Sequence, residues 1–103
     1  AGQPFEFNGT RRNEKPIVLL IEDDRTLRRL VRAEIGNLCD LTMAGNASLG
    51  ATMFRANPPD LSFIDINLPD GSGHTLLEWM LKVNPNAFDA GKMMLFINQC
   101  MNS

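Results

Sequence analysis

Two short apolar runs that each end abruptly in acidic residues constrain this sequence more than any other feature. The first, Ile17 to Ile21, is rich in branched side chains, has no polar alternation and is followed by the acidic triplet Glu22–Asp24. The second, Leu61 to Ile64, stops at Asp65. An uninterrupted apolar run of strand length is typical of a strand buried on both faces. Both runs therefore predict strands of a parallel sheet.

Helical periodicity alternates with strands along the rest of the chain. Leu27, Leu30, Val31, Ile35 and Leu38 recur every three or four residues, which predicts a helix whose apolar stripe packs against the sheet. The other expected elements are a strand at Asp40 to Ala44, a helix from Asn46 or Ala47 to the Pro58-Pro59 pair, a helix with Leu76, Leu77, Met80 and Leu81 on one face, and a strand at Met93 to Ile97. The order βαβαβαβ predicts an α/β fold, a doubly wound parallel sheet with helices on both faces.

The acids share one location in such a fold. Ligands of open parallel sheets bind just outside the carboxyl ends of the strands, where the triplet Glu22–Asp24 and Asp65 fall. Carboxylates this close repel and raise one another's pKa, so a cation or a proton has to compensate. Mg²⁺ is the simplest compensating ion, because it prefers oxygen ligands.

Each acid also has a simpler structural explanation. Asp23 or Asp24 would serve as the N-cap of the helix that follows, and Asp65 would be an ordinary residue before a Pro-Asp-Gly turn. A Gly-Ser-Gly at Gly71 to Gly73 lacks the remaining spacing of a phosphate-binding loop. The combination of two acidic strand ends favours a functional site over these explanations.

Length and composition limit the class of protein. With 103 residues, 44% of them hydrophobic and no long apolar stretch, the chain is expected to be one soluble domain that does not enter a membrane. A net charge of -2 argues against direct nucleic-acid binding, and the arginines between Arg25 and Arg32 are expected on a solvated helix face. Cys39 and Cys100 lack the CxxC spacing, and no signal peptide is visible, so a cytoplasmic location is expected.

The first fourteen residues are polar, unpatterned and interrupted by Pro and Gly, and the first residue is Ala. We interpret residues 1–14 as a leader or linker. Residues 15–103 are expected to form the folded domain.

Two stretches, KPIVLLIEDDRTLRRLVR from Lys15 and NPPDLSFIDINLPDGSG from Asn57, resemble the receiver domains of two-component response regulators, the CheY-like family. The 42-residue interval between Asp23 and Asp65 agrees with that family, and the resemblance covers Lys15 to Val83. It implies a flavodoxin-like sheet, here with the strand order 2-1-3-4.

The resemblance also implies roles for individual residues. Asp65 would be the phosphoacceptor, and Pro69 and Gly73 would shape the loop that follows it. In the family's pattern an arginine stands five positions beyond the second acid of a pair. Arg28 therefore identifies Asp23 as that acid and Glu22 as its partner, and a shift of one residue would add Asp24. The implied ligands of Mg²⁺ are Glu22, Asp23, Asp65 and the backbone carbonyl of Asn67.

The implied function is that of a phosphoacceptor signalling domain. A phosphohistidine on a sensor histidine kinase or a phosphotransfer protein would donate the phosphoryl group to Asp65, and a downstream output protein would read the result. Such a domain assists its own phosphorylation and is not otherwise an enzyme.

The carboxyl-terminal part departs from the family's pattern. The family has a Ser or Thr after strand four, where Asn98 stands here, and then a fifth strand with a Lys and a fifth helix, for which no sequence remains. The domain is therefore expected to be truncated or divergent, with Met93 to Ile97 as an uncharged edge strand.

Three interpretations stay open. The first is the phosphoacceptor domain. The second, favoured by the missing carboxyl-terminal elements, is a degenerate or truncated receiver that acts as a phosphorylation-independent interaction module. Self-association through the fourth strand is also expected. The third is a metal-dependent phosphatase, which would need an acid where Asn67 stands.

Overall fold

The computed structural model describes residues 15–85 and 93–96. The expected leader at residues 1–14, the loop at residues 86–92, and Asn98 lie outside the described residues. In chain order the elements are β1 (Ile17–Ile21), α1 (Arg25–Ile35), β2 (Asp40–Ala44), α2 (Ala47–Ala56), β3 (Leu61–Asp65), β4 (Asn67–Leu68), β5 (Gly71–Ser72), α3 (Gly73–Val83) and β6 (Met93–Phe96).

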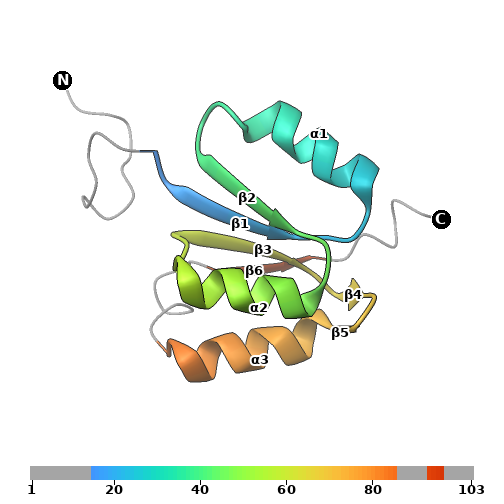
Figure 1. Ribbon diagram of the computed structural model, residues 1–103, viewed down its shortest axis with the longest axis vertical. Coiled ribbons are helices and arrows are strands. Elements are labelled where there is room, and N and C mark those ends of the chain that lie inside the picture. The colour runs from blue at the N-terminus through green and yellow to red at the C-terminus, as the bar shows by residue number, and fades with distance from the viewer. Residues whose placement is uncertain (1–14, 86–92, 97–103) are drawn as a thin grey trace.

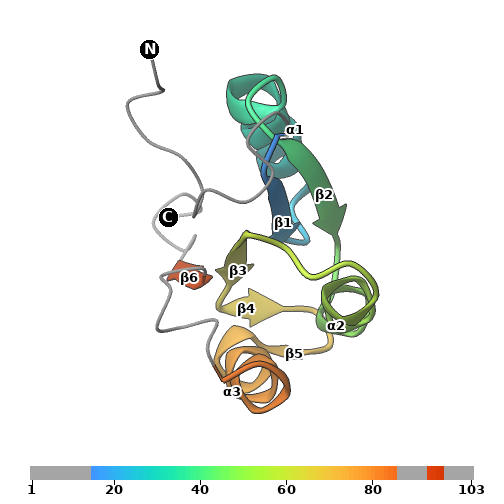
Figure 2. The ribbon, with the colours of Figure 1, turned by 90° about the vertical axis from the view of Figure 1, so that its left-hand side faces the viewer.

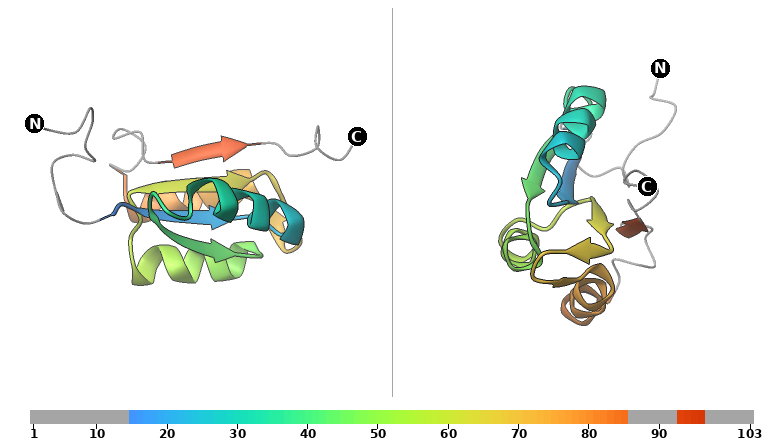
Figure 3. Two further views of the ribbon diagram at one scale, coloured as in Figure 1. Left: turned by 90° about the horizontal axis from the view of Figure 1, so that it is seen from above. Right: turned by 90° about the vertical axis from the view of Figure 1, so that its right-hand side faces the viewer.

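Four strands form one parallel sheet in the order β2-β1-β3-β6 (Figure 1). All four point the same way, as the view from above shows (Figure 3). Helix α1 covers one face of the sheet, and α2 and α3 cover the other (Figure 2). The predicted doubly wound α/β fold and the predicted strand order 2-1-3-4 are therefore confirmed.

The helices begin and end where local chemistry favours it. Asp24, Asn46 and Ser72 are the N-caps of α1, α2 and α3, and each side chain accepts a hydrogen bond from a main-chain N–H of the first turn. Helix α2 stops before the Pro58-Pro59 pair, as predicted. Within the described ranges, no helix has the length and apolar character needed to cross a membrane.

The main core lies between the sheet and the helix pair α2 and α3. Its buried residues are Leu19, Ile21, Ala44, Phe54, Ile64, Leu68, Leu76 and Met80. The Phe54 and Trp79 rings meet edge to face, with their centroids 6.1 Å apart. Helix α2 approaches β1 closely at Gly50, because a Cβ there would lie 2.6 Å from Cδ1 of Ile21. This packing fixes α2 relative to the end of β1.

The α1 face is less completely covered than the sequence pattern predicted. Leu30 is 53% exposed and Leu38 is 69% exposed, so neither packs fully against the sheet. For Leu38 the reason is that α1 ends at Ile35 and a turn follows, which takes this residue off the helical stripe. Beside Leu30 the structure has an apolar hollow of about 440 Å³. Its lining residues are Leu20, Leu27, Leu30, Val31, Glu34, Ile35 and Phe63.

A short hairpin after β3 was not predicted. Strands β4 and β5 pair antiparallel, with Asn67 opposite Ser72 and Leu68 opposite Gly71. The hairpin lies at the carboxyl end of the sheet, between β3 and α3 (Figure 1). It therefore borders the acidic residues.

Candidate functional site

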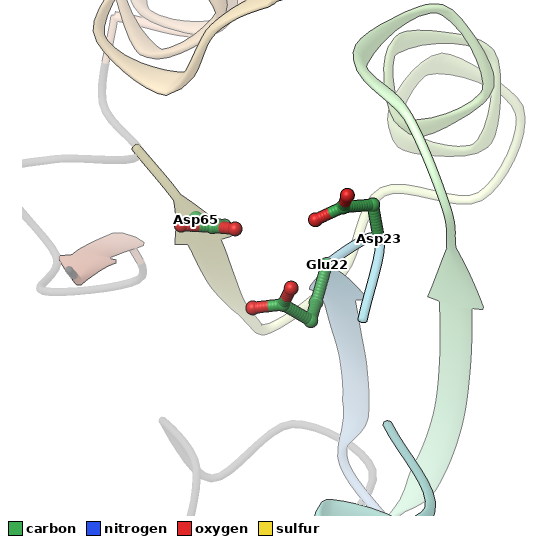
Figure 4. Close-up of side chains that lie close together, drawn as sticks. All are labelled: Glu22, Asp23 and Asp65. Atoms are coloured by element: carbon green, nitrogen blue, oxygen red, sulfur yellow. The ribbon is translucent and has the colours of Figure 1, made fainter. Parts of the chain in front are cut away.

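The carboxyl ends of β1 and β3 bring three acids together. The two strands are neighbouring and parallel, so Glu22 and Asp23, after β1, come close to Asp65, the last residue of β3. One carboxylate oxygen from each residue lies within 4.8 Å of the others. Figure 4 shows the three carboxylates turned toward a shared space between the strand ends. The expected convergence of the acids is thus present in the structure.

Glu22 is fully buried, and its side chain and its main-chain carbonyl each accept a hydrogen bond. Its Oε2 accepts a hydrogen bond of 2.9 Å from the main-chain N–H of Asp24, and its carbonyl accepts one of 2.9 Å from Nη1 of Arg28. Burial raises the pKa of Glu22 to about 7; the Asp24 N–H opposes this shift and the charge of Asp65 adds to it. The site therefore holds this carboxylate at a cost in desolvation, to which charge repulsion adds.

Asp65 is 1% exposed, and among the described residues only one of its oxygens has a hydrogen-bond partner. Oδ1 accepts a bond of 3.2 Å from the main-chain N–H of Asn67. Oδ2 is buried and has no hydrogen-bond partner among the described residues. Burial raises the pKa of Asp65. An unpartnered, buried carboxylate oxygen beside two further carboxylates fits a hard divalent cation such as Mg²⁺. Asp23 is exposed, which leaves the cluster open to solvent.

Asp24 lies outside the cluster. Its Oδ1 accepts hydrogen bonds of 2.8 Å and 3.2 Å from the main-chain N–H groups of Thr26 and Leu27. Of the two roles that the sequence left open for this residue, the structure favours the helix cap over the metal ligand.

The loop after Asp65 turns back against it. Gly73 donates a main-chain hydrogen bond of 2.7 Å to the carbonyl of Ile66, and a Cβ at Gly73 would overlap the main-chain carbonyl of Asp65. Only glycine fits this close approach. Asn67 begins β4, and Pro69 lies exposed in the turn between β4 and β5. The expected role of Asn98 falls outside the part of the chain that the structure describes.

Sequence reasoning missed two contacts of this region. Arg28, used only to align the acids, reaches back to the carbonyl of Glu22. Asp70, taken as a turn residue, accepts hydrogen bonds from the main chain of α2. No local pattern signals the Asp70 contact, because it joins segments more than twenty residues apart. Arg28 and Glu22 are six residues apart, and their contact depends on how the chain turns between β1 and α1.

Comparisons with known proteins agree with this geometry. Residues 18–89 match the family model of the response regulator receiver domain. Over 75 residues the chain is 33% identical to the photosynthetic apparatus regulatory protein RegA of Rhodovulum sulfidophilum. The aligned segment covers 72% of this chain and 41% of that protein. The chain thus spans less than half the length of this curated relative.

Solved structures of receiver domains share the fold. The non-phosphorylated HemR receiver domain of Leptospira biflexa has a TM-score of 0.69 and 28% identity, covering 82% of this chain and 66% of that one. The response regulator TrrA of Thermotoga maritima, in complex with Mg²⁺-BeF, has a TM-score of 0.67 and 19% identity, covering 80% of this chain and 67% of that one.

Proposed function

Because the chain belongs to the response regulator receiver domain family, we propose that it is a phosphoacceptor signalling domain in which Asp65 receives a phosphoryl group from a phosphohistidine. The observation that carries the proposal is the buried Oδ2 of Asp65, which has no hydrogen-bond partner among the described residues and lies beside Glu22 and Asp23. A structural acid at a strand end would have its oxygens satisfied by nearby donors.

The proposed reaction transfers phosphorus from nitrogen to oxygen. A carboxylate oxygen of Asp65 forms a bond to phosphorus while the bond between phosphorus and the donor imidazole breaks, and the electron pair of that bond stays on the imidazole nitrogen. The product is an acyl phosphate on Asp65. An ionised carboxylate is already a nucleophile, so the step needs positioning and charge neutralisation more than a general base.

Glu22, Asp23, Asp65 and the backbone carbonyl of Asn67 would hold Mg²⁺ in this proposal. When bound, Mg²⁺ supplies positive charge that favours the ionised carboxylates and neutralises oxygens of the phosphoryl group. The raised pKa values of Glu22 and Asp65 support this arrangement, because they mark a pocket where negative charge lacks compensation. The TrrA structure, which has the same fold, contains Mg²⁺-BeF.

The proposed partners follow from this chemistry. A sensor histidine kinase or a phosphotransfer protein in the cytoplasm would carry the phosphohistidine, and a downstream output protein would respond to the phosphorylated form. The domain would assist its own phosphorylation without turning over a separate substrate. Direct binding to nucleic acid is not part of the proposal, given the net charge of -2.

Intact mass spectrometry tests the proposal. The chain is incubated with a small acyl phosphate donor, with Mg²⁺ or with chelator. We expect a gain in mass of one phosphoryl group that requires Mg²⁺ and is absent in Asp65→Asn. Asp40→Asn is the matched control, because Asp40 is an exposed aspartate at the amino end of β2 and should not affect labelling. Equal labelling of the Asp65 variant would refute the proposal.

A second candidate function is a phosphorylation-independent interaction module that self-associates. It is favoured by the position of β6 at the edge of the sheet, where the described residues provide a partner only in β3. Sedimentation at micromolar concentration tests it. A dimer whose stability is unchanged by the donor and Mg²⁺ would support this function, whereas a monomer at all concentrations would exclude self-association.

A further inference from the structure

Asp70 connects two segments that are far apart in the sequence. It lies in the turn between β4 and β5, and its two carboxylate oxygens reach the first turn of α2. Oδ1 accepts a hydrogen bond of 2.7 Å from the main-chain N–H of Ala47, and Oδ2 accepts one of 2.9 Å from that of Ser48. The carboxylate is thus held at two points by a helix that begins more than twenty residues earlier in the chain.

Helix α2 already has a cap of its own. The side chain of Asn46 accepts a hydrogen bond of 2.8 Å from the main-chain N–H of Leu49. Asp70 accepts from the two N–H groups before that of Leu49, those of Ala47 and Ser48, and its negative charge lies at the positive end of the helix dipole. These two hydrogen bonds lower the pKa of Asp70. Because the second cap comes from another segment, it fixes that segment as well as the helix.

The segment that Asp70 fixes is the one that lines the acidic cluster. The two ends of this segment meet where the main-chain N–H of Gly73 donates a hydrogen bond to the carbonyl of Ile66. Beside them, the main-chain N–H of Asn67 donates to Oδ1 of Asp65. The hairpin of β4 and β5 joins these ends to the turn at Asp70. The segment is therefore anchored at two ends, at Asp65 and at α2.

We propose that Asp70 is a positioning residue, which tethers the β4–β5 hairpin to α2 and thereby holds Asn67 in place against Asp65. Asp70 does not touch the reacting atoms. In the part that concerns Mg²⁺ and phosphorylation, the inference rests on the proposed function. The tether itself is a property of the metal-free protein and can be measured without either.

A purely structural role is the competing explanation. In that case Asp70 would stabilise only the first turn of α2, as Asn46 does, and the hairpin would not depend on it. Asn46→Ala is therefore the matched control, because it removes a cap from the same helix and leaves the hairpin untouched.

Amide hydrogen exchange on the metal-free chain separates the two roles. In Asp70→Ala we expect the amides of Asn67 and Gly73 to exchange about fivefold faster or more, since the anchor at α2 is lost. In Asn46→Ala we expect faster exchange in the first turn of α2 and unchanged exchange at Asn67 and Gly73. Asp70→Asn should lie between the parent and Asp70→Ala, because the amide oxygen can replace only one of the two acceptors.

Unchanged exchange at Asn67 and Gly73 in Asp70→Ala would overturn the proposal, whatever happens at α2. The second readout is the Mg²⁺ concentration that gives half of the maximal rise in melting temperature of each variant. We expect this concentration to rise several-fold in Asp70→Ala only. Faster loop exchange with no phosphoryl labelling of the parent would retain the tether and reject the proposed function. Normal labelling of the parent with unchanged loop exchange in Asp70→Ala would reject the tether and retain the proposed function.

Discussion

Nη1 of Arg28 donates a hydrogen bond of 2.9 Å to the main-chain carbonyl of Glu22. The bond runs from the second turn of α1 back to the residue that follows β1, so the helix holds the end of the strand from which two of the three clustered acids project. It accounts for an arginine five residues beyond Asp23. The guanidinium fixes the main chain of the acid pair and is not itself one of the clustered groups.

Replacement of Arg28 by Ala should therefore destabilise the fold and the proposed metal site together. We expect the free energy of unfolding to fall by about 1–2 kcal/mol, because the lost bond has a charged donor and is partly buried. Arg29→Ala is the control, since Arg29 is exposed on the same helix and should change stability by less than about 0.5 kcal/mol. Urea unfolding with and without Mg²⁺ measures both effects. Equal stabilities of the two variants would contradict a holding role for Arg28.

The metal-free protein should lose stability as the pH rises from about 4.5 to about 7. Burial raises the pKa of Glu22 from 4.5 to about 7, and burial also raises the pKa of Asp65. In this pH range the folded state keeps a proton that the unfolded chain releases, so the folded state binds more protons and the free energy of unfolding falls with pH.

Thermal melts in chelator across this pH range measure the effect. In Asp65→Asn we expect a shallower decline and a higher melting temperature near pH 7, because one of the clustered charges is gone. Saturating Mg²⁺ should flatten the decline in the parent. A metal-free melting temperature that rises steadily from pH 5 to pH 7 would show that the acids are already compensated within the protein.

Gly73→Ala should disturb the loop more than the helix. A Cβ at this position would overlap the main-chain carbonyl of Asp65, so the loop has to move. We expect a loss of about 1–3 kcal/mol in the free energy of unfolding, despite the better helix propensity of Ala. Gly71→Ala is the matched control, because a Cβ there would meet nothing within 4 Å. Similar losses in both variants would mean that backbone freedom, and not the close approach, explains Gly73.

The sheet could be predicted because its signals are local. Uninterrupted apolar runs such as Ile17–Ile21 mark buried parallel strands, and the helical periods between them indicate a parallel sheet with helices on both faces. The strand order itself was implied by the resemblance to receiver domains. The meeting of Glu22 and Asp65 followed from the same reasoning, since carboxyl ends of neighbouring parallel strands coincide.

The remaining details depend on geometry that the sequence does not specify. The choice of Asp24 as the cap depends on the extended conformation of that residue, with φ of -75° and ψ of 114°. Strands of two residues, such as Asn67–Leu68, are too short to show a period. The bonds from Asp70 to α2 cross more than twenty residues, and the exposure of Leu38 depends on where α1 ends.

The most direct test of the account identifies which residue carries the phosphoryl group. The chain is incubated with an acyl phosphate donor and Mg²⁺ and is then treated with borohydride, which reduces an aspartyl phosphate to homoserine. Peptide mass spectrometry locates the converted residue. We predict homoserine at position 65, at a level that falls to background in chelator. Conversion at another aspartate, or conversion at position 65 that is independent of Mg²⁺, would contradict the account.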